Sequence, residues 1–274
     1  MDTRAGRSFG PEDAAAWIAV PGPDDDKYSR GVVGFVTGSA RYPGAAVLGV
    51  EAALHTGVGM VRYLGAGRPR RLVLQRRPEA VTAEGRVQAW VVGSGQDPET
   101  IDDVAAAARD RALGDPVPIV IDAGALGFVE QARGARVLVP HAGELARLLH
   151  REREAIAADP AASALEAAER FGAVVLLKGS TSYVADVGGG LLEVACAPAW
   201  TATAGTGDAL AGVLGALLAT HALELEADPG CAAPLAATAA VLHGLAAQQA
   251  SRGGPFTVLG LCAELPGVVR ELLA

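Results

Sequence analysis

Short apolar runs that each end in glycine or a polar residue recur along the chain, with helical segments between them. The runs are continuous rather than alternating, which is typical of strands that are buried on both faces of a sheet. This order predicts an α/β fold, with a central, mostly parallel sheet and helices on both faces. The expected strands are 32–36, 60–64, 89–92, 119–121, 136–139 and 174–177, and the expected helices are 44–55, 99–113, 143–149 and 160–171.

The last third of the chain follows a different order. Residues 181–185 and 191–195 predict a hairpin across Gly188-Gly189-Gly190, and the chain after Gly207 is expected to be mostly helical. No internal repeat or change of composition divides the sequence. We therefore expect a polar leader over residues 1–26 and a single domain over residues 27–274.

The charge balance excludes one class of partner. The chain has 23 Lys+Arg residues and 31 Asp+Glu residues, which give a net charge of −8. A general nucleic-acid binder needs an electropositive surface, so nucleic acid is not expected as a partner. A small anion held in one local pocket is compatible with this charge. Lys27 and Lys178 are the two lysines of the chain, and the other basic residues are arginines. A genomic base composition that favours Arg codons explains most of this preference for Arg over Lys.

Cysteine usage and hydropathy indicate the compartment. Cys196, Cys231 and Cys262 are far apart in sequence, as expected for reduced thiols in a cytosolic protein. The first ten residues lack the apolar core of a signal peptide. The apolar stretches 209–219 and 231–250 are interpreted as buried helices rather than membrane spans. A cytoplasmic protein with no membrane partner is expected.

Polar residues and glycines follow the predicted strands directly. In open α/β sheets, ligands bind beyond the carboxyl ends of the strands. Any one of these residues could belong to an ordinary polar loop, but together they predict that one edge of the sheet is a polar binding site. They are Thr37-Gly38-Ser39, Gly93-Ser94-Gly95, Asp122, His141 and Lys178-Gly179-Ser180-Thr181.

The run Gly205-Thr206-Gly207-Asp208 opens a long apolar helix. The first N–H groups of a helix are unpaired and carry a partial positive charge, so this run predicts an anion hole for a phosphate. Alternatively, the glycines form only a tight turn and Asp208 only stabilises the helix start. A carboxylate beside a phosphate site is costly unless it handles a proton or a metal, which favours a functional role.

A second phosphate site is predicted over Lys178-Gly179-Ser180-Thr181-Ser182. Lysine is a compact charge that suits phosphate, and the hydroxyl groups add donors. The alternative is a surface lysine in a hairpin turn. His141 is singled out because it follows a strand and precedes a helix that carries Glu144, whereas His55, His150, His221 and His243 are interpreted as packing or surface residues.

Several runs together resemble one family, the NAD(P)H-hydrate dehydratases of the ribokinase-like superfamily. They appear in the family's order and cover residues 27–274, nearly the whole chain. The carrying runs are Lys27-Tyr28-Ser29-Arg30-Gly31, Gly38-Ser39, Tyr42-Pro43-Gly44-Ala45-Ala46, Gly57 to Val61, Asp122 to Leu126, Val139 to Glu144, Leu177-Lys178-Gly179 and Gly205 to Asp208.

The resemblance implies a ribokinase-like fold and an ADP-dependent enzyme that repairs hydrated NADH and NADPH. Phosphorylation of the hydroxyl of the hydrate would be followed by loss of phosphate. It implies Mg²⁺, ADP or ATP as co-substrate, and a homotetramer. The hydrate epimerase of the family is often N-terminal in the same chain, but only residues 1–26 precede the match here, so no N-terminal epimerase domain is expected. The implied catalytic residues are Gly205, Thr206, Gly207 and Asp208, with Asp208 as the base. The implied substrate contacts are Ala46, Gly95, His141 and Asp208, and the implied nucleotide contacts are Lys178, Gly179, Ser180, Thr181, Ser182 and Gly207.

Three positions depart from the family pattern. Gly124 replaces an Asp, Gly127 stands where Asn is frequent, and the run 200–203 precedes the anion hole with unusual residues. Asp122 is therefore given no firm catalytic role, and the metal ligands are not assigned. Two other functions stay open: a small-molecule kinase of the hydroxyethylthiazole or hydroxymethylpyrimidine type, and an inactive nucleotide-binding module.

Overall fold

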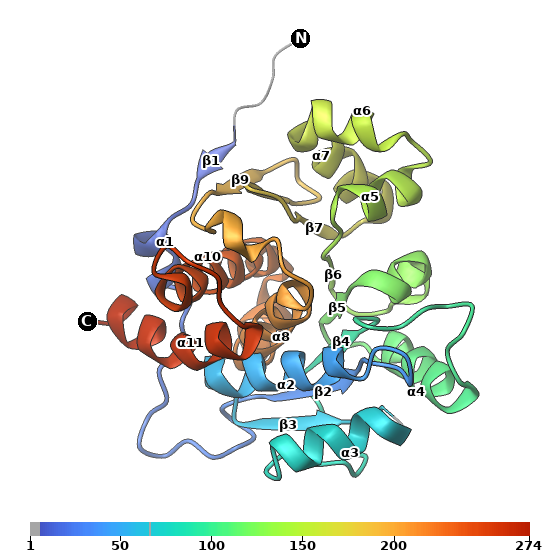
Figure 1. Ribbon diagram of the computed structural model, residues 1–274, viewed down its shortest axis with the longest axis vertical. Helices are drawn as coiled ribbons and strands as arrows, with labels where there is room; N and C mark the ends of the chain where they lie inside the picture. The colour runs from blue at the N-terminus through green and yellow to red at the C-terminus, as the bar shows by residue number, and fades with distance from the viewer. Residues whose placement is uncertain (1–5, 66) are drawn as a thin grey trace.

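The computed structural model describes residues 6–65 and 67–274, and it forms one nine-stranded sheet between two layers of helices (Figure 1). The strand order is β1-β9-β8-β7-β6-β5-β4-β2-β3. Neighbouring strands are parallel, except that β8 is antiparallel to both β7 and β9. The strands are β1 (Arg7–Ser8), β2 (Val32–Val36), β3 (Met60–Tyr63), β4 (Ala89–Val92), β5 (Ile119–Ile121), β6 (Arg136–Leu138), β7 (Val174–Leu177), β8 (Ser182–Ala185) and β9 (Leu191–Val194).

The predicted α/β architecture and the predicted hairpin are confirmed. All residues of β2, β3, β4, β5 and β7 are buried, as the continuous apolar runs predict. The helices are α1 (Pro11–Ala15), α2 (Gly44–Thr56), α3 (Gly67–Arg76), α4 (Asp103–Gly114), α5 (Ala142–Leu149), α6 (Arg153–Ala158), α7 (Pro160–Phe171), α8 (Thr206–Thr220), α9 (Ala222–Ala227), α10 (Ala232–Ser251) and α11 (Val258–Leu272), and the 3₁₀ helices are η1 (Ala123–Gln131), η2 (Ala199–Thr201) and η3 (Pro229–Cys231).

One face of the sheet is covered by α2, α8, α10 and α11, which pack on one another, and the other by α4, η1, α5 and α7 (Figure 1). Helices α2 and α8 approach very closely. A Cβ atom at Gly212 on α8 would lie 2.2 Å from the carbonyl oxygen of Gly49 on α2, so glycine is required there. This contact fixes the direction in which α8 points its first turn toward the sheet edge.

The interpretation of the N-terminal segment as a polar leader is wrong in part, within residues 6–26. Residues 7–8 add β1 to the sheet edge beside β9, and α1 packs on α10. Phe9 and Ala14 are buried apolar side chains, so this segment joins the core. The helix expected from residue 99 begins only at Asp103, because the Asp102 side chain accepts the N–H of Ala105 and caps it there.

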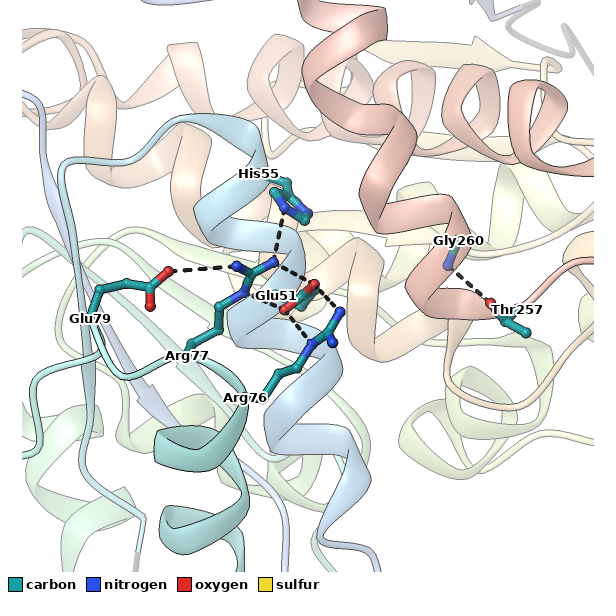
Figure 2. A network of polar contacts seen from close by, with 7 residues as sticks. All are labelled: Glu51, His55, Arg76, Arg77, Glu79, Thr257 and Gly260. Carbon is teal, nitrogen blue, oxygen red and sulfur yellow. Dashed lines mark hydrogen bonds and ion pairs between the residues drawn. The ribbon is translucent and has the colours of Figure 1, made fainter.

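Helix α3 was not predicted, and a buried ion-pair cluster attaches its end to α2. Figure 2 shows the carboxylate of Glu51 between the guanidinium groups of Arg76 and Arg77, at 2.9 and 2.5 Å. Only 1% of the Glu51 side chain is exposed. Burial opposes its charge, but the hydrogen bonds from Arg77 and Arg76 outweigh this and lower the pKa of Glu51.

Among the residues that the structure describes, one helix is long and apolar enough to cross a membrane by length and composition. It covers Pro229–Ser251, and 78% of its apolar window is buried inside the fold. It contains α10, which contacts α8, α11 and the strands β7, β8 and β9. We therefore identify it as a core helix, in agreement with the interpretation of this stretch from the sequence.

Candidate active site

The first turn of α8 lies at the carboxyl edge of the sheet with no side chain capping it. Gly205 precedes the helix with φ of +97°, a conformation that favours glycine, and its Cβ would also lie 2.6 Å from Leu48. The Thr206 hydroxyl donates back to the carbonyl oxygens of Thr201 and Thr203, at 2.9 and 2.8 Å. The loop is thus held in place. The N–H of Thr206 donates to the carbonyl oxygen of Thr203, and the N–H groups of Gly207 and Asp208 stay available to an anion.

Lys178 lies directly opposite this helix start. A Cβ atom at Gly207 would be 3.4 Å from Lys178 Nζ, so glycine leaves room between the ammonium group and the backbone of α8. The two phosphate sites predicted separately from the sequence therefore converge. Lys178 is held in register because it pairs with His141 in an isolated parallel bridge beyond the end of β7.

The Lys178 ammonium group is surrounded by carboxylates. Its Nζ lies 2.9 Å from Asp122 Oδ1 and 3.9 Å from Glu144 Oε2, and the hydroxyl of Ser94 donates to Asp122 Oδ2 at 2.9 Å. Burial disfavours the charged lysine, but Asp122 and Glu144 outweigh this and raise the pKa of Lys178. The ammonium group is therefore charged, and it is oriented by strand ends that are remote in sequence.

Asp208 is the most perturbed carboxyl group beside these residues. Burial raises its pKa from 3.8 to about 7, the charge of Asp122 adds to this effect, and Lys178 partly offsets it. A carboxyl group with a pKa near neutral is suited to accept a proton during a reaction. The arrangement puts a proton acceptor, a cation and a helix N-terminus at one place.

The residues predicted to contact the substrate differ in how accessible they are to a ligand. Ala46 is fully buried on α2, under the Gly38 loop, so its side chain is not accessible to a ligand. Gly95 lies against the Tyr42 loop, in a left-handed conformation with φ of +65°. His141 caps α5, because its Nδ1 accepts the N–H groups of Gly143 and Glu144. Its Nε2 lies 3.5 Å from Glu144 Oε1, and 55% of its side chain is exposed.

The remaining residues of the Lys178–Ser182 run form the turn into β8. Gly179 and Ser180 are exposed, and Thr181 and Ser182 are partly buried. The backbone donors of Gly179 and Ser180 and the Ser180 hydroxyl are therefore open to a ligand beside Lys178. This placement agrees with a nucleotide contact, which remains a prediction.

His243 is a residue of this site that the sequence interpretation assigned to helix packing. Its Nε2 lies 3.0 Å from the carbonyl oxygen of Thr206, so the ring donates to the first turn of α8. Burial lowers the pKa of His243 to about 4, which keeps the ring neutral. In the sequence, His243 is distinguished only by its position in the middle of an apolar helix. That position fits a histidine that packs between helices as well as one that orients the first turn of α8.

A preformed metal cage is not found. Within residues 6–65 and 67–274, no group of three or more His, Cys, Asp and Glu side chains is arranged to hold a metal ion. The Asp122 carboxylate is already bonded to Lys178 and Ser94. Magnesium at such sites is carried largely by nucleotide phosphates with one or two carboxylates, and the Asp208 carboxylate fits that donor set.

Solved structures place the fold in a known class. The chain superimposes on a ribokinase-like superfamily protein from Enterococcus faecalis with a TM-score of 0.82 and 20% identity, covering 99% of this chain and 98% of that one. It matches the ADP/ATP-dependent NAD(P)H-hydrate dehydratase of Bacillus subtilis, which was co-crystallised with ATP and Mg²⁺, with a TM-score of 0.86 and 24% identity over 98% of this chain and 100% of that one. The ribokinase-like fold predicted from the sequence is thus confirmed.

Sequence comparison narrows the class to a family. The model of the family described as NAD(P)H-hydrate dehydratase matches residues 33–259. The chain is 34% identical to the ADP-dependent (S)-NAD(P)H-hydrate dehydratase of Xanthomonas campestris, over 92% of this chain and 93% of that protein. The chain therefore belongs to the NAD(P)H-hydrate dehydratase family.

Other relatives are longer than this chain. It is 42% identical to the bifunctional NAD(P)H-hydrate repair enzyme Nnr of Mycobacterium tuberculosis, over 77% of this chain and 46% of that protein. The chain thus matches just under half the length of that relative.

Proposed function

We propose that the protein is an ADP-dependent (S)-NAD(P)H-hydrate dehydratase, which converts hydrated NADH or NADPH and ADP into NAD(P)H, AMP and phosphate. The observation that carries the proposal is the position of Asp208, a carboxyl group with a pKa of about 7 in the first turn of α8 and opposite Lys178. The names of the relatives support the same reaction.

The proposed reaction has two steps. Asp208 accepts the proton of the ring hydroxyl while that oxygen takes the terminal phosphoryl group of ADP, and AMP leaves. Phosphate then departs from the ring carbon and takes the proton that the neighbouring carbon loses, which restores the double bond. The N–H groups of Gly205 and Gly207 and the ammonium group of Lys178 stabilise the charge on the phosphoryl group in transfer.

The nucleotide has a proposed place in this arrangement. The run Lys178–Ser182 and Gly207 hold ADP, and Ala46, Gly95 and His141 contact the hydrated dinucleotide, Ala46 through its backbone. Bound Mg²⁺ supplies neutralisation of phosphate charge. The crystallisation of the Bacillus subtilis protein with ATP and Mg²⁺ supports both ligands. We further propose that the protein acts in the cytoplasm as a homotetramer, which light scattering of the purified protein tests.

One assay separates this function from its alternatives. The protein is incubated with hydrated NADH, Mg²⁺ and either ADP or ATP, and the near-ultraviolet absorbance of reduced nicotinamide is followed. We expect NADH to return with ADP. Failure with both nucleotides, together with phosphorylation of a hydroxyethylthiazole or hydroxymethylpyrimidine, would make the protein a kinase. Failure with every substrate would indicate an inactive nucleotide-binding module.

A further inference from the structure

A cavity opens at the same edge of the sheet as the candidate active site, on the face covered by η1, α5 and α7. Its volume is about 630 Å³, within the ordinary range of ligand pockets. Gln96 and Glu144 belong to its lining, and they connect it to the candidate active site. Gln96 follows Gly95 in the chain, and Glu144 Oε2 lies 3.9 Å from Lys178 Nζ.

The cavity is separate from the proposed ADP contacts. None of the lining residues comes from the Lys178–Ser182 run or from the first turn of α8. A molecule whose reacting end lies at Asp208 could therefore extend past Gly95 and Glu144 into the cavity, while ADP occupies the other side.

The side-chain amide of Gln96 is the feature of this cavity that indicates a ligand. The residue is 8% exposed, and neither Nε2 nor Oε1 of its amide has a hydrogen-bond partner among the described residues. An unpaired buried amide destabilises a fold by about 1–3 kcal/mol, so such groups are rare without a purpose. A side-chain amide offers one donor and one acceptor side by side, which matches the N6 and N7 positions of adenine.

The rest of the lining has complementary chemistry. Phe128 lines the cavity with a partly exposed aromatic ring on which a base can stack, whereas Phe171 is only 8% exposed and adds apolar wall. Arg147 and Arg170 also line the cavity, both are exposed, and among the described residues neither has a carboxylate at ion-pair distance. Guanidinium groups suit phosphate because they can donate two parallel hydrogen bonds.

Two glycines keep the cavity open. A Cβ atom at Gly124 would lie 2.3 Å from the carbonyl oxygen of Gln96, so a side chain there would displace the Gln96 backbone. Gly127 also lines the cavity, and a Cβ atom there would meet nothing within 4 Å. Gly127 therefore accepts a side chain without a clash, and such a side chain can occupy the cavity.

We propose that this cavity binds the adenosine phosphate half of the hydrated dinucleotide, with adenine on the Gln96 amide and phosphate at Arg147 and Arg170. The proposal rests on the proposed function, because it takes hydrated NADH or NADPH as the substrate. The hydrated nicotinamide ring reacts at Asp208, and the distal half of the same molecule gives binding energy at the cavity.

The test compares a full and a truncated substrate. Hydrated NADPH and hydrated reduced nicotinamide mononucleotide, which lacks the adenosine half, are assayed with wild-type protein, Gln96→Met and Gly127→Gln. For hydrated NADPH we expect the KM to rise about tenfold in each variant, because one bidentate base contact or the cavity space is lost. The KM for the truncated substrate and the KM for ADP should stay unchanged.

Gly114→Gln is the matched control, because Gly114 ends α4 and its Cβ would also meet nothing within 4 Å. Thermal unfolding of Gln96→Met adds a second readout, since a purely structural amide would alter stability and leave both KM values in place. Equal KM values for both substrates in wild type and variants would overturn the inference and leave the proposed function intact. If the wild-type protein converts neither hydrated substrate to its reduced nucleotide, the proposed function is wrong, and the inference, which rests on it, is wrong as well.

Discussion

Replacement of Asp208 by asparagine should inactivate the protein and stabilise its fold at the same time. The pKa of Asp208 is about 7 in the folded protein, against an ordinary value of 3.8. A carboxyl group whose pKa is raised in the folded state binds its proton more tightly there than in the unfolded state. The free energy of unfolding therefore falls as the pH rises from the pKa of the unfolded state to the pKa of the folded state. A shift of this size corresponds to about 4 kcal/mol, and partial solvent access reduces that to about 2–4 kcal/mol.

Urea unfolding at two pH values measures this effect. At about pH 8 we expect Asp208→Asn to be more stable than wild type by about 2–4 kcal/mol, because the amide carries no charge to bury. At about pH 5 the difference should shrink to less than half, since wild-type Asp208 is then protonated in the folded state. Turnover of hydrated NADH should be lost at both pH values.

Asp103→Asn is the matched control, because Asp103 is also in the first turn of a helix but is exposed. Its effect should stay within about 0.5 kcal/mol at both pH values. If Asp208→Asn shows no gain at about pH 8, or the same gain at both pH values, the carboxyl group is not held at a raised pKa. Near-normal turnover of the variant would refute its role as the base.

Three further predictions follow from the same geometry. In steady-state kinetics, kcat/KM of wild type should fall about tenfold per pH unit below about pH 7, since protonated Asp208 cannot accept a proton; a flat profile would contradict this. Lys178→Met should lower the free energy of unfolding by about 3 kcal/mol, because Asp122 stays buried without its cation; an unchanged urea midpoint would contradict it. Glu51→Gln should lower stability by about 2 kcal/mol in thermal unfolding and leave kcat unchanged, since it loosens α3 from α2 away from Asp208; a changed kcat in the folded variant would contradict it.

The sheet could be predicted from the sequence because burial on both faces leaves a local signature. The apolar runs at 32–36 and 174–177 are continuous, and each ends where the backbone leaves the sheet. The same rule predicted that Asp122, His141 and Lys178 lie at one edge, since the carboxyl ends of parallel strands meet there. It did not predict that the start of α8 lies opposite Lys178.

Contacts between remote segments could not be predicted in this way. Helix α3 has a polar sequence rich in arginine, and it is attached to α2 by a carboxylate 25 residues earlier in the chain. His243 contacts the Thr206 carbonyl across 37 residues. Neither pair has a fixed spacing, because the packing of one helix on another decides which side chains meet.

The leader segment failed for a related reason. Residues 7–15 are mostly polar in composition, and their few apolar members, Phe9, Ala14 and Ala15, give too little periodicity for a prediction. Their burial depends on an open sheet edge at β9 and on the surface of α10. Both partners belong to the last third of the chain, so no local pattern in residues 7–15 reveals them.

The measurement that tests the central claim most directly is the stoichiometry of the reaction with ADP. Purified protein is given hydrated NADH, ADP and Mg²⁺, and NADH, AMP and inorganic phosphate are quantified together, with Asp208→Asn in parallel. The proposed mechanism predicts that the three products form in equal amounts and that the variant forms none. AMP or phosphate without NADH, or NADH from the variant at the wild-type rate, would contradict it.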